Sequence, residues 1–417
     1  MITAYYSHCL GSSEYKNTRK QEEVPMPRRR AERTTVSTHP VDRSVTRREF
    51  VRHSTAAGLA TGSVALTTLP TVLRAGALGN EKEVRLAWIG VGGRGTSLLQ
   101  QALSHVPTSK LTVKAICDID PAARERAVSL CGPMRPVGID DYRRVLDMKD
   151  VDAVFIATPI YLHREMAVAG AVAGKHMYCE KPLGRTAEEV AAVDRAISDS
   201  NVRFQVGFQW RYDKRWQTSI RQVHEGAIGK VHFVSASRHV AGYPTSGWYI
   251  DRALSGDLIV EQAVHEMNIF CWLMKGPPLR AAGFGGINAF SEVPPDRSIM
   301  DHYTVSFEFP ENVRLSYSHC VYTAPGIGGL EQMAMGRSAA MDLRNATVHK
   351  DGKHRTADLG PLPNATGEAI ASFVDCVRND KEPLSNLEMG KNATLMAILG
   401  RTAMYEGRVV EWKEVTA

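Results

Sequence analysis

The sequence lacks the features of several specialised protein classes. Its seven cysteines form no C-x-x-C pair and no Cys/His cluster at zinc spacing, so we predict neither a metal site nor a disulfide framework. Charge is unbalanced only in residues 1–77, which hold 12 Lys and Arg against 6 Asp and Glu, whereas residues 78–417 hold 39 of each. The neutral part has no basic surplus of the kind a nucleic-acid-binding domain carries, so we expect no nucleic-acid partner.

The basic surplus lies in residues 1–77, which we predict to be a disordered leader with an export signal. Arg47-Arg48 precedes an uncharged stretch at 54–73, and the small residues Ala75-Gly76-Ala77 follow it. This order is typical of a cleavable signal peptide, and the paired arginines indicate the twin-arginine route. Thr and Gly interrupt the stretch too often for a stable membrane anchor, which needs about 20 mostly apolar residues. We therefore expect a periplasmic or secreted protein that is exported folded.

The chain after the leader begins with a strand, a glycine turn and a helix. The apolar run Val84–Ile89 leads directly into Gly90-Val91-Gly92-Gly93-Arg94-Gly95, and a helical pattern follows. In this context Gly90 permits the tight turn, Gly92 lets the backbone approach a pyrophosphate, and Gly95 allows helix and strand to pack closely. The pattern predicts a dinucleotide site; Gly93 and Arg94 belong to the same turn, and Arg94 is either a phosphate contact or a solvated loop residue.

The nucleotide is predicted to be NAD. A second strand is expected at 111–117, and Asp118 follows it, 23 residues after Gly95. A carboxylate there hydrogen-bonds the ribose hydroxyls of the adenosine and repels a 2′-phosphate, so NADP is less favoured.

Polar residues follow the later strands of the same alternating pattern. Thr158 and Pro159 end one apolar strand, and Glu180 and Lys181 end the next. Because ligands bind at the carboxyl ends of strands in such sheets, we expect these residues to meet the nicotinamide half of the cofactor. His163 joins these candidate cofactor contacts, although a purely structural role for it stays open.

These motifs resemble the glucose–fructose oxidoreductase / inositol dehydrogenase (Gfo/Idh/MocA) family. The resemblance runs from about residue 84 to the C-terminus, and the E-K-P element is its most specific part. Its matching stretches are Gly90–Gly95, Ala157-Thr158-Pro159 with His163, Glu180–Leu183, Val206-Gly207-Phe208 with Arg211, and Ser255–Asn268.

The resemblance implies an α/β fold of two domains. We expect a leader at 1–77, an NAD-binding Rossmann domain at 82–205, and at 206–417 an α/β domain with an open, mostly antiparallel sheet that binds substrate and forms oligomers. Terminal helices of the family pack back on the first domain. A homo-oligomer, dimer or tetramer, is expected.

The resemblance also implies hydride transfer between nicotinamide and a sugar or polyol carbon. In the family, a lysine at the place of Lys181 lies beside the nicotinamide, and a histidine at the place of His265 accepts a proton. Glu261 stands where the family usually has Asp, and Asn268 where it often has a second Asp, so the proton relay is left open. The spacing predicts that Glu261 and His265 lie on one face of a helix at Glu261–Lys275, where the carboxylate orients the ring. A solvated lysine and a surface ion pair are the competing interpretations.

Candidate substrate contacts are Trp248, Tyr249 and Arg211, together with His265. Flat aromatic and forked polar groups suit the faces and hydroxyls of sugars. Core packing of the aromatic rings and a solvated arginine are equally compatible with the sequence.

Export constrains the function further, because the exterior of a bacterium offers no NAD pool. The cofactor should then stay tightly bound and return to its starting state in each cycle. One chemistry that meets this condition is an oxidoreductase that oxidises one sugar and reduces another. The alternative is a redox-neutral glycosidase or lyase that works by oxidation, elimination, hydration and reduction. A non-catalytic sugar-binding module is a third hypothesis, against which the intact glycine turn, Lys181 and His265 argue.

Overall fold

The computed structural model describes residues 83–416 except 108–109, 241, 243–245, 290–296 and 324–326. The predicted leader, including Arg47-Arg48, lies outside the described residues. Within them, no helix has the length and apolar character needed to span a membrane. The six cysteines of the described part are free thiols, and five of them are buried. The same part contains no group of three His, Cys, Asp or Glu residues that could hold a metal ion.

The first sheet has six parallel strands in the order β3-β2-β1-β4-β5-β6. Nearly every residue of its three central strands is buried, as expected for apolar runs covered on both faces. The chain order reverses between β1 and β4, which is where such sheets bind ligands. The strands are β1 (Val84–Ile89), β2 (Leu111–Cys117), β3 (Val137–Ile139), β4 (Ala153–Ile156), β5 (His176–Cys179) and β6 (Phe204–Val206).

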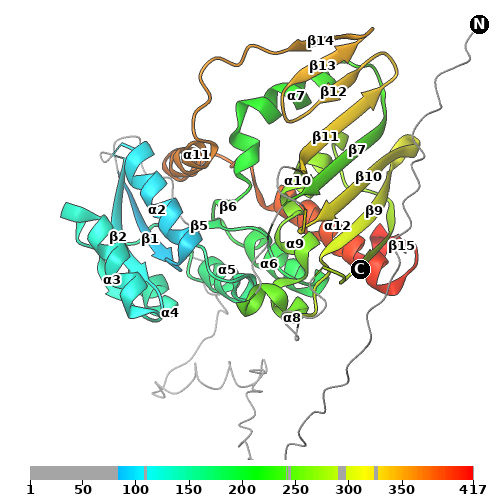
Figure 1. The fold of residues 1–417 in the computed structure, drawn as a ribbon. Coiled ribbons are helices and arrows are strands. Elements are labelled where there is room, and N and C mark those ends of the chain that lie inside the picture. The colour runs from blue at the N-terminus through cyan, green and yellow to red at the C-terminus, as the bar shows by residue number, and fades with distance from the viewer. Residues whose placement is uncertain are drawn as a thin grey trace, which may run out of the picture. The chain divides into compact units, whose positions relative to one another are not determined.

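Helices cover both faces of this sheet (Figure 1). One face packs against α2, α3 and α11 in a cluster that includes Leu98 and Phe373. The other face packs against α4, α5 and α6, whose buried residues include Met166 and Val190. These helices are α2 (Gly93–His105), α3 (Pro121–Leu130), α4 (Tyr142–Asp147), α5 (His163–Val172), α6 (Ala187–Ser198) and, from the end of the chain, α11 (Ala365–Asn379).

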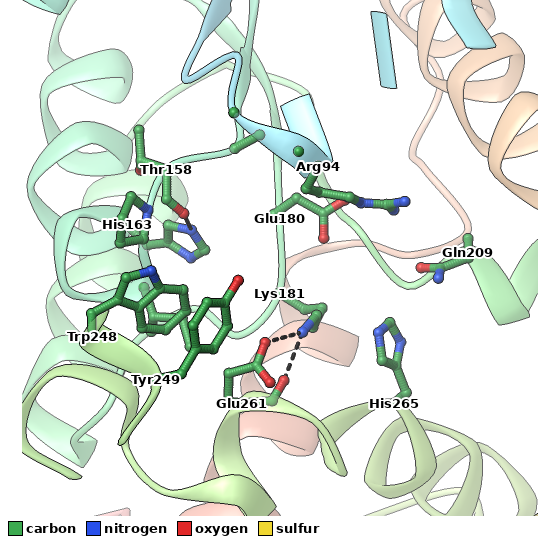
Figure 2. A pocket seen from close by; sticks show the side chains of 15 residues that line it. Arg94, Thr158, His163, Glu180, Lys181, Gln209, Trp248, Tyr249, Glu261 and His265 are labelled. Atoms are coloured by element: carbon green, nitrogen blue, oxygen red, sulfur yellow. Dashed lines mark hydrogen bonds and ion pairs between the residues drawn. The ribbon is translucent and has the colours of Figure 1, made fainter. Parts of the chain in front are cut away.

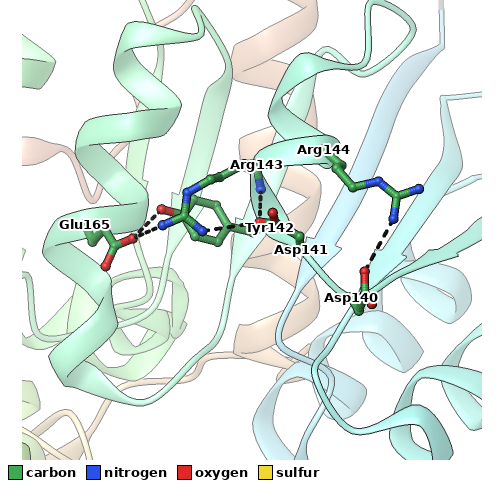
Figure 3. Close-up of polar contacts among 6 residues, drawn as sticks. All are labelled: Asp140, Asp141, Tyr142, Arg143, Arg144 and Glu165. Atoms are coloured by element: carbon green, nitrogen blue, oxygen red, sulfur yellow. Dashed lines mark hydrogen bonds and ion pairs between the residues drawn. The ribbon is translucent and has the colours of Figure 1, made fainter. Parts of the chain in front are cut away.

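Helix α4 is joined to α5 by a cluster of polar contacts (Figure 3). Asp141 caps α4 by accepting the backbone N–H of Arg143 at 3.0 Å. The hydroxyl of Tyr142 and the guanidinium of Arg143 both donate to Oε1 of Glu165, at 2.6 and 2.7 Å. Exposed contacts of this kind add little stability, but here they fix the helix whose first residue is His163.

The second sheet has nine strands in the order β14-β13-β12-β11-β7-β10-β9-β8-β15. Only the pairing of β7 with β10 is parallel. Residues of β9 alternate between buried and more accessible, so one face of the sheet forms core and the other is open. The strands are β7 (Val231–His239), β8 (Arg280–Gly286), β9 (His302–Phe309), β10 (Val313–Cys320), β11 (Gly329–Gly336), β12 (Ala340–Asp342), β13 (Thr347–Lys350), β14 (Lys353–Thr356) and β15 (Val410–Glu411).

The buried face of this sheet packs against α7 (Lys214–His224), α10 (Val264–Met274) and α12 (Leu387–Glu406). Two short helices, α8 (Arg252–Ser255) and α9 (Leu258–Glu261), precede α10. Single 3-10 turns occur at η1 (Gly132–Met134), η2 (Ile160–Leu162), η3 (Gln209–Tyr212), η4 (Gly247–Ile250), η5 (Pro310–Asn312) and η6 (Trp412–Val415).

The predicted fold class is confirmed: a Rossmann domain precedes an α/β domain with a mostly antiparallel sheet. Two expected elements are confirmed only in part. In place of the single helix expected at Glu261–Lys275, the short helix α9 ends at Glu261 and α10 begins at Val264. At this break, Nζ of Lys181 donates to the backbone oxygen of Glu261 at 2.6 Å, the oxygen that would accept His265 N–H in a continuous helix. The sequence pattern also predicts a strand at 344–349; residues 347–349 lie in β13, whereas 344–346 belong to the turn between β12 and β13.

Candidate active site

A cavity of about 440 Å³ lies at the carboxyl ends of β1, β4 and β5, where the first sheet meets η4, α9 and α10 (Figure 2). It brings together most of the predicted cofactor residues and all three predicted catalytic residues. Its lining consists of Gly92, Gly93, Arg94, Ala157, Thr158, Pro159, Ile160, His163, Glu180, Lys181, Gln209, Trp248, Tyr249, Glu261 and His265.

The glycine turn has the form that a dinucleotide pyrophosphate requires. Gly90 has φ +87°, and a Cβ there would lie 2.8 Å from the backbone oxygen of Ala157. At Gly95 a Cβ would lie 1.9 Å from the backbone oxygen of Gly90, so α2 can approach the turn only with glycine at this position. Gly92 and Gly93 are exposed, with no described atom within 4 Å of their Cβ positions. No side chain caps α2, so its first N–H groups stay available to phosphate oxygens.

Asp118, the predicted ribose ligand, lies next to this turn rather than in the cavity lining. Its Oδ2 accepts the backbone N–H of Val91 at 2.7 Å, and its Oδ1 accepts that of Asp120 at 2.9 Å. The side chain is partly exposed at the end of β2. Asp118 therefore both fixes the glycine turn and keeps acceptor capacity for ribose hydroxyls.

One wall of the cavity is an ion pair between the glycine turn and the end of β5. Nε of Arg94 lies 2.7 Å from Oε1 of Glu180, which is 5% exposed. A Cβ on Gly207 would lie 2.8 Å from this carboxylate, so the carboxylate packs directly against the backbone after β6. This contact gives Arg94 a defined partner within the site.

His163 closes the cavity on the side of η2. Its two ring nitrogens lie 2.7 Å from the backbone oxygen of Pro182 and 2.9 Å from that of Thr158. Burial lowers the pKa of His163, and the two backbone carbonyls oppose this shift. His163 thus ties the Thr158 loop to the E-K-P segment, and its contacts are those of a positioning residue.

Lys181 and Glu261 form the polar centre of the cavity. Nζ of Lys181 lies 3.0 Å from Oε1 of Glu261 and also donates to the backbone oxygen of Glu261. Their side chains are 15% and 14% exposed. The predicted pairing of Glu261 with His265 on one helix face is therefore wrong, because the helix breaks between them and the carboxylate turns to Lys181.

His265 lies in the first turn of α10, and Figure 2 shows it across Lys181 from Tyr249. Its ring packs against Trp210 at 5.2 Å between centroids and against the edge of Phe208 at 5.8 Å. Among the described residues its Nδ1 has no hydrogen-bond partner. Burial and the nearby cations of Lys181 and Arg238 lower the pKa of His265 well below its usual value. The imidazole is therefore neutral near pH 7 and can accept a proton.

Trp248 and Tyr249 supply an aromatic wall. Their rings stack with centroids 3.9 Å apart, and both line the cavity from η4. Burial, and then the charge of Glu261, raise the pKa of Tyr249, so the phenol keeps its proton. Flat rings with a hydroxyl at the rim suit the apolar faces of a sugar.

Arg211 does not reach the cavity, so its predicted contact with substrate is wrong. It is 2% exposed, donates from Nε to Oδ1 of Asn268 at 2.9 Å, and lies over the ring of Trp272. Burial lowers the pKa of Arg211 to about 10.

The sequence prediction assigned no site role to three lining residues, Ala157, Ile160 and Gln209. Gln209 comes just after β6, at the same sheet edge as Thr158 and Glu180. Strand-end position alone was thus a usable signal for Gln209. Ile160 lies in a loop turn and had no comparable signal.

Two family models match the chain. One, described as an oxidoreductase family with an NAD-binding Rossmann fold, covers residues 84–208, and the other, the GFO/IDH/MocA C-terminal domain, covers 216–333.

Curated relatives cover different shares of the chain. A scyllo-inositol 2-dehydrogenase (NAD(+)) of Bacillus subtilis is 28% identical over 340 residues, which span 75% of this chain and 94% of the relative. A glycosyl hydrolase family 109 protein of Saccharopolyspora erythraea is 33% identical over 207 residues, 45% of this chain and 44% of the relative. A solved levoglucosan dehydrogenase in complex with NADH and levoglucosan shares the fold, with a TM-score of 0.68 at 19% identity over 79% of this chain and 99% of that one.

Proposed function

The chain belongs to the Gfo/Idh/MocA family of NAD-dependent oxidoreductases that act on CH–OH groups, and from this we propose that it oxidises or reduces a ring carbon of a sugar or polyol. The observation that carries the proposal is the Lys181–Glu261 pair at the centre of a cavity whose other end is the glycine turn. Relatives named as inositol and levoglucosan dehydrogenases support this substrate class.

Lys181 and His265 have different roles at the substrate hydroxyl. Bound NAD accepts or returns a hydride, and the protein must orient the carbon and move the hydroxyl proton. The ammonium group of Lys181 donates two hydrogen bonds to Glu261, which leaves its third hydrogen for the substrate oxygen. His265 is neutral and its Nδ1 lacks a described partner, so it takes the proton as the carbonyl forms.

We further propose that the enzyme is exported and keeps its cofactor bound. Arg47-Arg48 and the signal-like stretch after it support export by the twin-arginine route. If so, the protein acts in the periplasm or outside the cell, and NAD is bound before export and stays bound. Replacing both arginines by lysine should leave the protein in the cytoplasm, and unchanged export of that variant would contradict the assignment.

A homo-oligomer built on the open sheet face is also proposed. Phe284 is 80% exposed and pairs with Thr304 on that face, while Tyr322 and Ile327, after β10 and before β11, are 63% and 70% exposed. Large exposed apolar side chains of this kind mark interaction surfaces. Sedimentation velocity should give a dimer or tetramer, and a monomer at micromolar concentration would rule this interface out.

A redox-neutral glycosidase is the second candidate function. In that chemistry, transient oxidation of a ring carbon acidifies the neighbouring C–H, elimination expels the aglycone, and hydration and reduction complete the cycle. The similarity to a glycosyl hydrolase family 109 protein favours a glycosidase over a non-catalytic sugar-binding module. The same Lys181, Glu261 and His265 would serve it, so geometry alone does not separate the two enzymes.

One assay separates the two enzymes. The purified protein is incubated with aryl glycosides and, separately, with pairs of free sugars. Oxidation of one sugar with reduction of another supports the oxidoreductase, whereas aglycone release without net NADH supports the glycosidase. Lys181→Met serves as the inactive control, and turnover of neither substrate class would contradict the proposal.

A further inference from the structure

A buried ion pair lies beneath the site without reaching the cavity. Arg238 on β7 and Glu266 on α10 meet with Nε 2.6 Å from Oε1, and their side chains are 11% and 0% exposed. Neither residue lines the cavity, and proton transfer at the substrate hydroxyl uses neither of them. A largely buried pair of this kind is expensive to desolvate and is weak evidence for stability. Its position therefore calls for another explanation.

The pair is connected to His265 through Trp210. The guanidinium carbon of Arg238 lies 5.6 Å from the centroid of the Trp210 ring. The His265 ring lies 5.2 Å from the same indole, tilted by 32°. Trp216 stacks on Trp210 at 5.3 Å and 14°, which fixes the indole in the core. Arg238 and His265 thus share one rigid aromatic neighbour.

We propose that the Arg238–Glu266 ion pair is a positioning element for His265, acting through Trp210, which both the guanidinium and the imidazole contact. The pair holds the indole that packs against the imidazole, and it places a fixed cation near the ring. The inference rests on the proposed function only in taking His265 as the proton acceptor.

The charge arrangement gives this geometry a chemical consequence. A fixed cation disfavours protonation of the ring, whereas the Glu266 carboxylate partly offsets that effect. The pKa of His265 is lowered, with Arg238 among the causes, after burial and Lys181. Burial raises the pKa of Glu266 and Arg238 opposes this. The titratable and charged groups around His265 are Lys181 after β5, Glu180 at its end, Arg94 on α2, Tyr249 on η4, Glu261 on α9, Glu266 on α10 and Arg238 on β7.

Replacing the two members of the pair one at a time should shift the titration midpoint of His265 in opposite directions. Protein labelled with ¹³C at histidine Cε1 is titrated by NMR, and the His265 signal is assigned by its loss in His265→Gln. Arg238→Met removes the cation, so the His265 midpoint should rise by roughly 0.5–1 pH unit. Glu266→Gln leaves the cation uncompensated, so the midpoint should fall or stay below the accessible range. If the ion pair had only a structural role, both variants would disrupt the core and raise the His265 midpoint. That result would overturn the proposal.

Two further variants guard against misfolding of the single ones. Arg238→Lys keeps the charge and should hold the midpoint at its wild-type value. The double variant Arg238→Met/Glu266→Met removes both charges and should raise the midpoint by less than Arg238→Met alone; a double variant whose midpoint rises as much as that of Arg238→Met would overturn the proposal. Arg280→Met, which breaks the exposed Arg280–Glu308 pair, is the matched control and should change nothing.

The NMR readout is independent of turnover. Should the enzyme prove inactive on sugars and polyols while the opposite shifts appear, the proposed substrate class fails and the positioning role stands. With an active enzyme, the acidic limb of the kcat/KM profile should follow the same shifts. An active enzyme whose acidic limb stays in place in Arg238→Met contradicts the positioning role alone.

Discussion

Among single residues, Lys181 is the one whose replacement best distinguishes a catalytic role from a role in cofactor binding. Its ammonium group contacts Glu261 on a different element and lies in the cavity beside the Glu180 wall. The glycine turn that would hold the pyrophosphate does not depend on it. Loss of the ammonium group should therefore remove chemistry without removing the nucleotide.

Lys181→Met is expected to lower kcat by about 10²–10⁴-fold while the affinity for NADH changes little, because it removes the ammonium group that hydrogen-bonds the substrate oxygen during proton transfer. Steady-state kinetics and fluorescence titration with NADH measure the two quantities. Lys391→Met is the matched control, since Lys391 also pairs with a carboxylate, Asp194 at 2.9 Å, but lies outside the cavity lining. Equal losses in both variants would remove Lys181 from the catalytic machinery.

Sequence reasoning identified the residues of the site better than it identified their partners. Lys181, Glu261 and His265 all line one cavity. The i, i+4 spacing nevertheless paired the wrong two, because the helix is interrupted after Glu261 and a lysine 80 positions away donates to Glu261 instead. Arg211 was misplaced for a similar reason: its partner Asn268 lies 57 positions away. Contacts of this range follow from tertiary packing, which local patterns do not contain.

Among the elements, α2 and the turn before it depend on one close approach. Gly95 lies against the backbone oxygen of Gly90, whereas Gly93, in the same helical turn, faces open space. Alanine substitutions at Gly93 and Gly95 thus test whether glycine is required here for close packing or for backbone flexibility.

Gly95→Ala is expected to cost about 1–3 kcal/mol of unfolding free energy and to weaken NAD binding, because its Cβ would lie 1.9 Å from a backbone oxygen that cannot rotate away. Gly93→Ala should leave stability within about 0.5 kcal/mol of wild type. Chemical denaturation and NADH titration report both effects. Similar stability of the two variants would contradict the close approach.

His176 makes the junction of β5 and β6 sensitive to acid. Its Nδ1 accepts the backbone N–H of Arg203 at 2.8 Å, which requires a neutral ring. Burial, and then the charge of Arg203, lower the pKa of His176 to about 4. The unfolded chain binds this proton near pH 6.5, so stability is complete above that value and falls as pH drops from 6.5 toward 4.

His176→Asn is expected to remove this acid sensitivity, because the amide oxygen accepts the same N–H and does not titrate. Wild type should lose up to roughly 3 kcal/mol more than the variant between pH 7 and pH 4. Urea midpoints measured across that range give the difference. Parallel pH profiles for the two proteins would show that His176 does not titrate in this way.

The order of the elements was more predictable than their ends. Alternating apolar strands and helices indicated a parallel sheet up to β6, and these runs are buried as expected. The second sheet was incompletely predicted: β11, β12, β14 and β15 were missed, and the strand expected at 344–349 matches β13 only in part. Short strands of mixed polarity, such as β14 with four exposed residues, carry no periodic signal against which a boundary can be placed.

For the whole molecule, the proposed export and the structure of the nucleotide site lead to one joint prediction. A protein carried out of the cytoplasm already folded has a single opportunity to acquire NAD. Its site must then bind the nucleotide tightly enough to survive dilution, and the Arg94–Glu180 wall, the constrained glycine turn and the shared cavity with α9 and α10 are fixed features suited to slow release.

Protein purified after export, without added cofactor, is therefore expected to carry NAD(H) at close to one equivalent. Mass spectrometry of the denatured supernatant measures the amount, and stripping the cofactor should lower stability by about 3–4 kcal/mol if the nucleotide normally exceeds its Kd by 100–1,000-fold. Gly93→Asp is the matched control: its side chain enters open space, so the fold should persist, while its charge repels the pyrophosphate and empties the site. A wild-type protein that is isolated empty, and that binds NAD only at millimolar concentration, would break the link between export and cofactor retention while leaving the oxidoreductase fold and its Lys181 site unaffected.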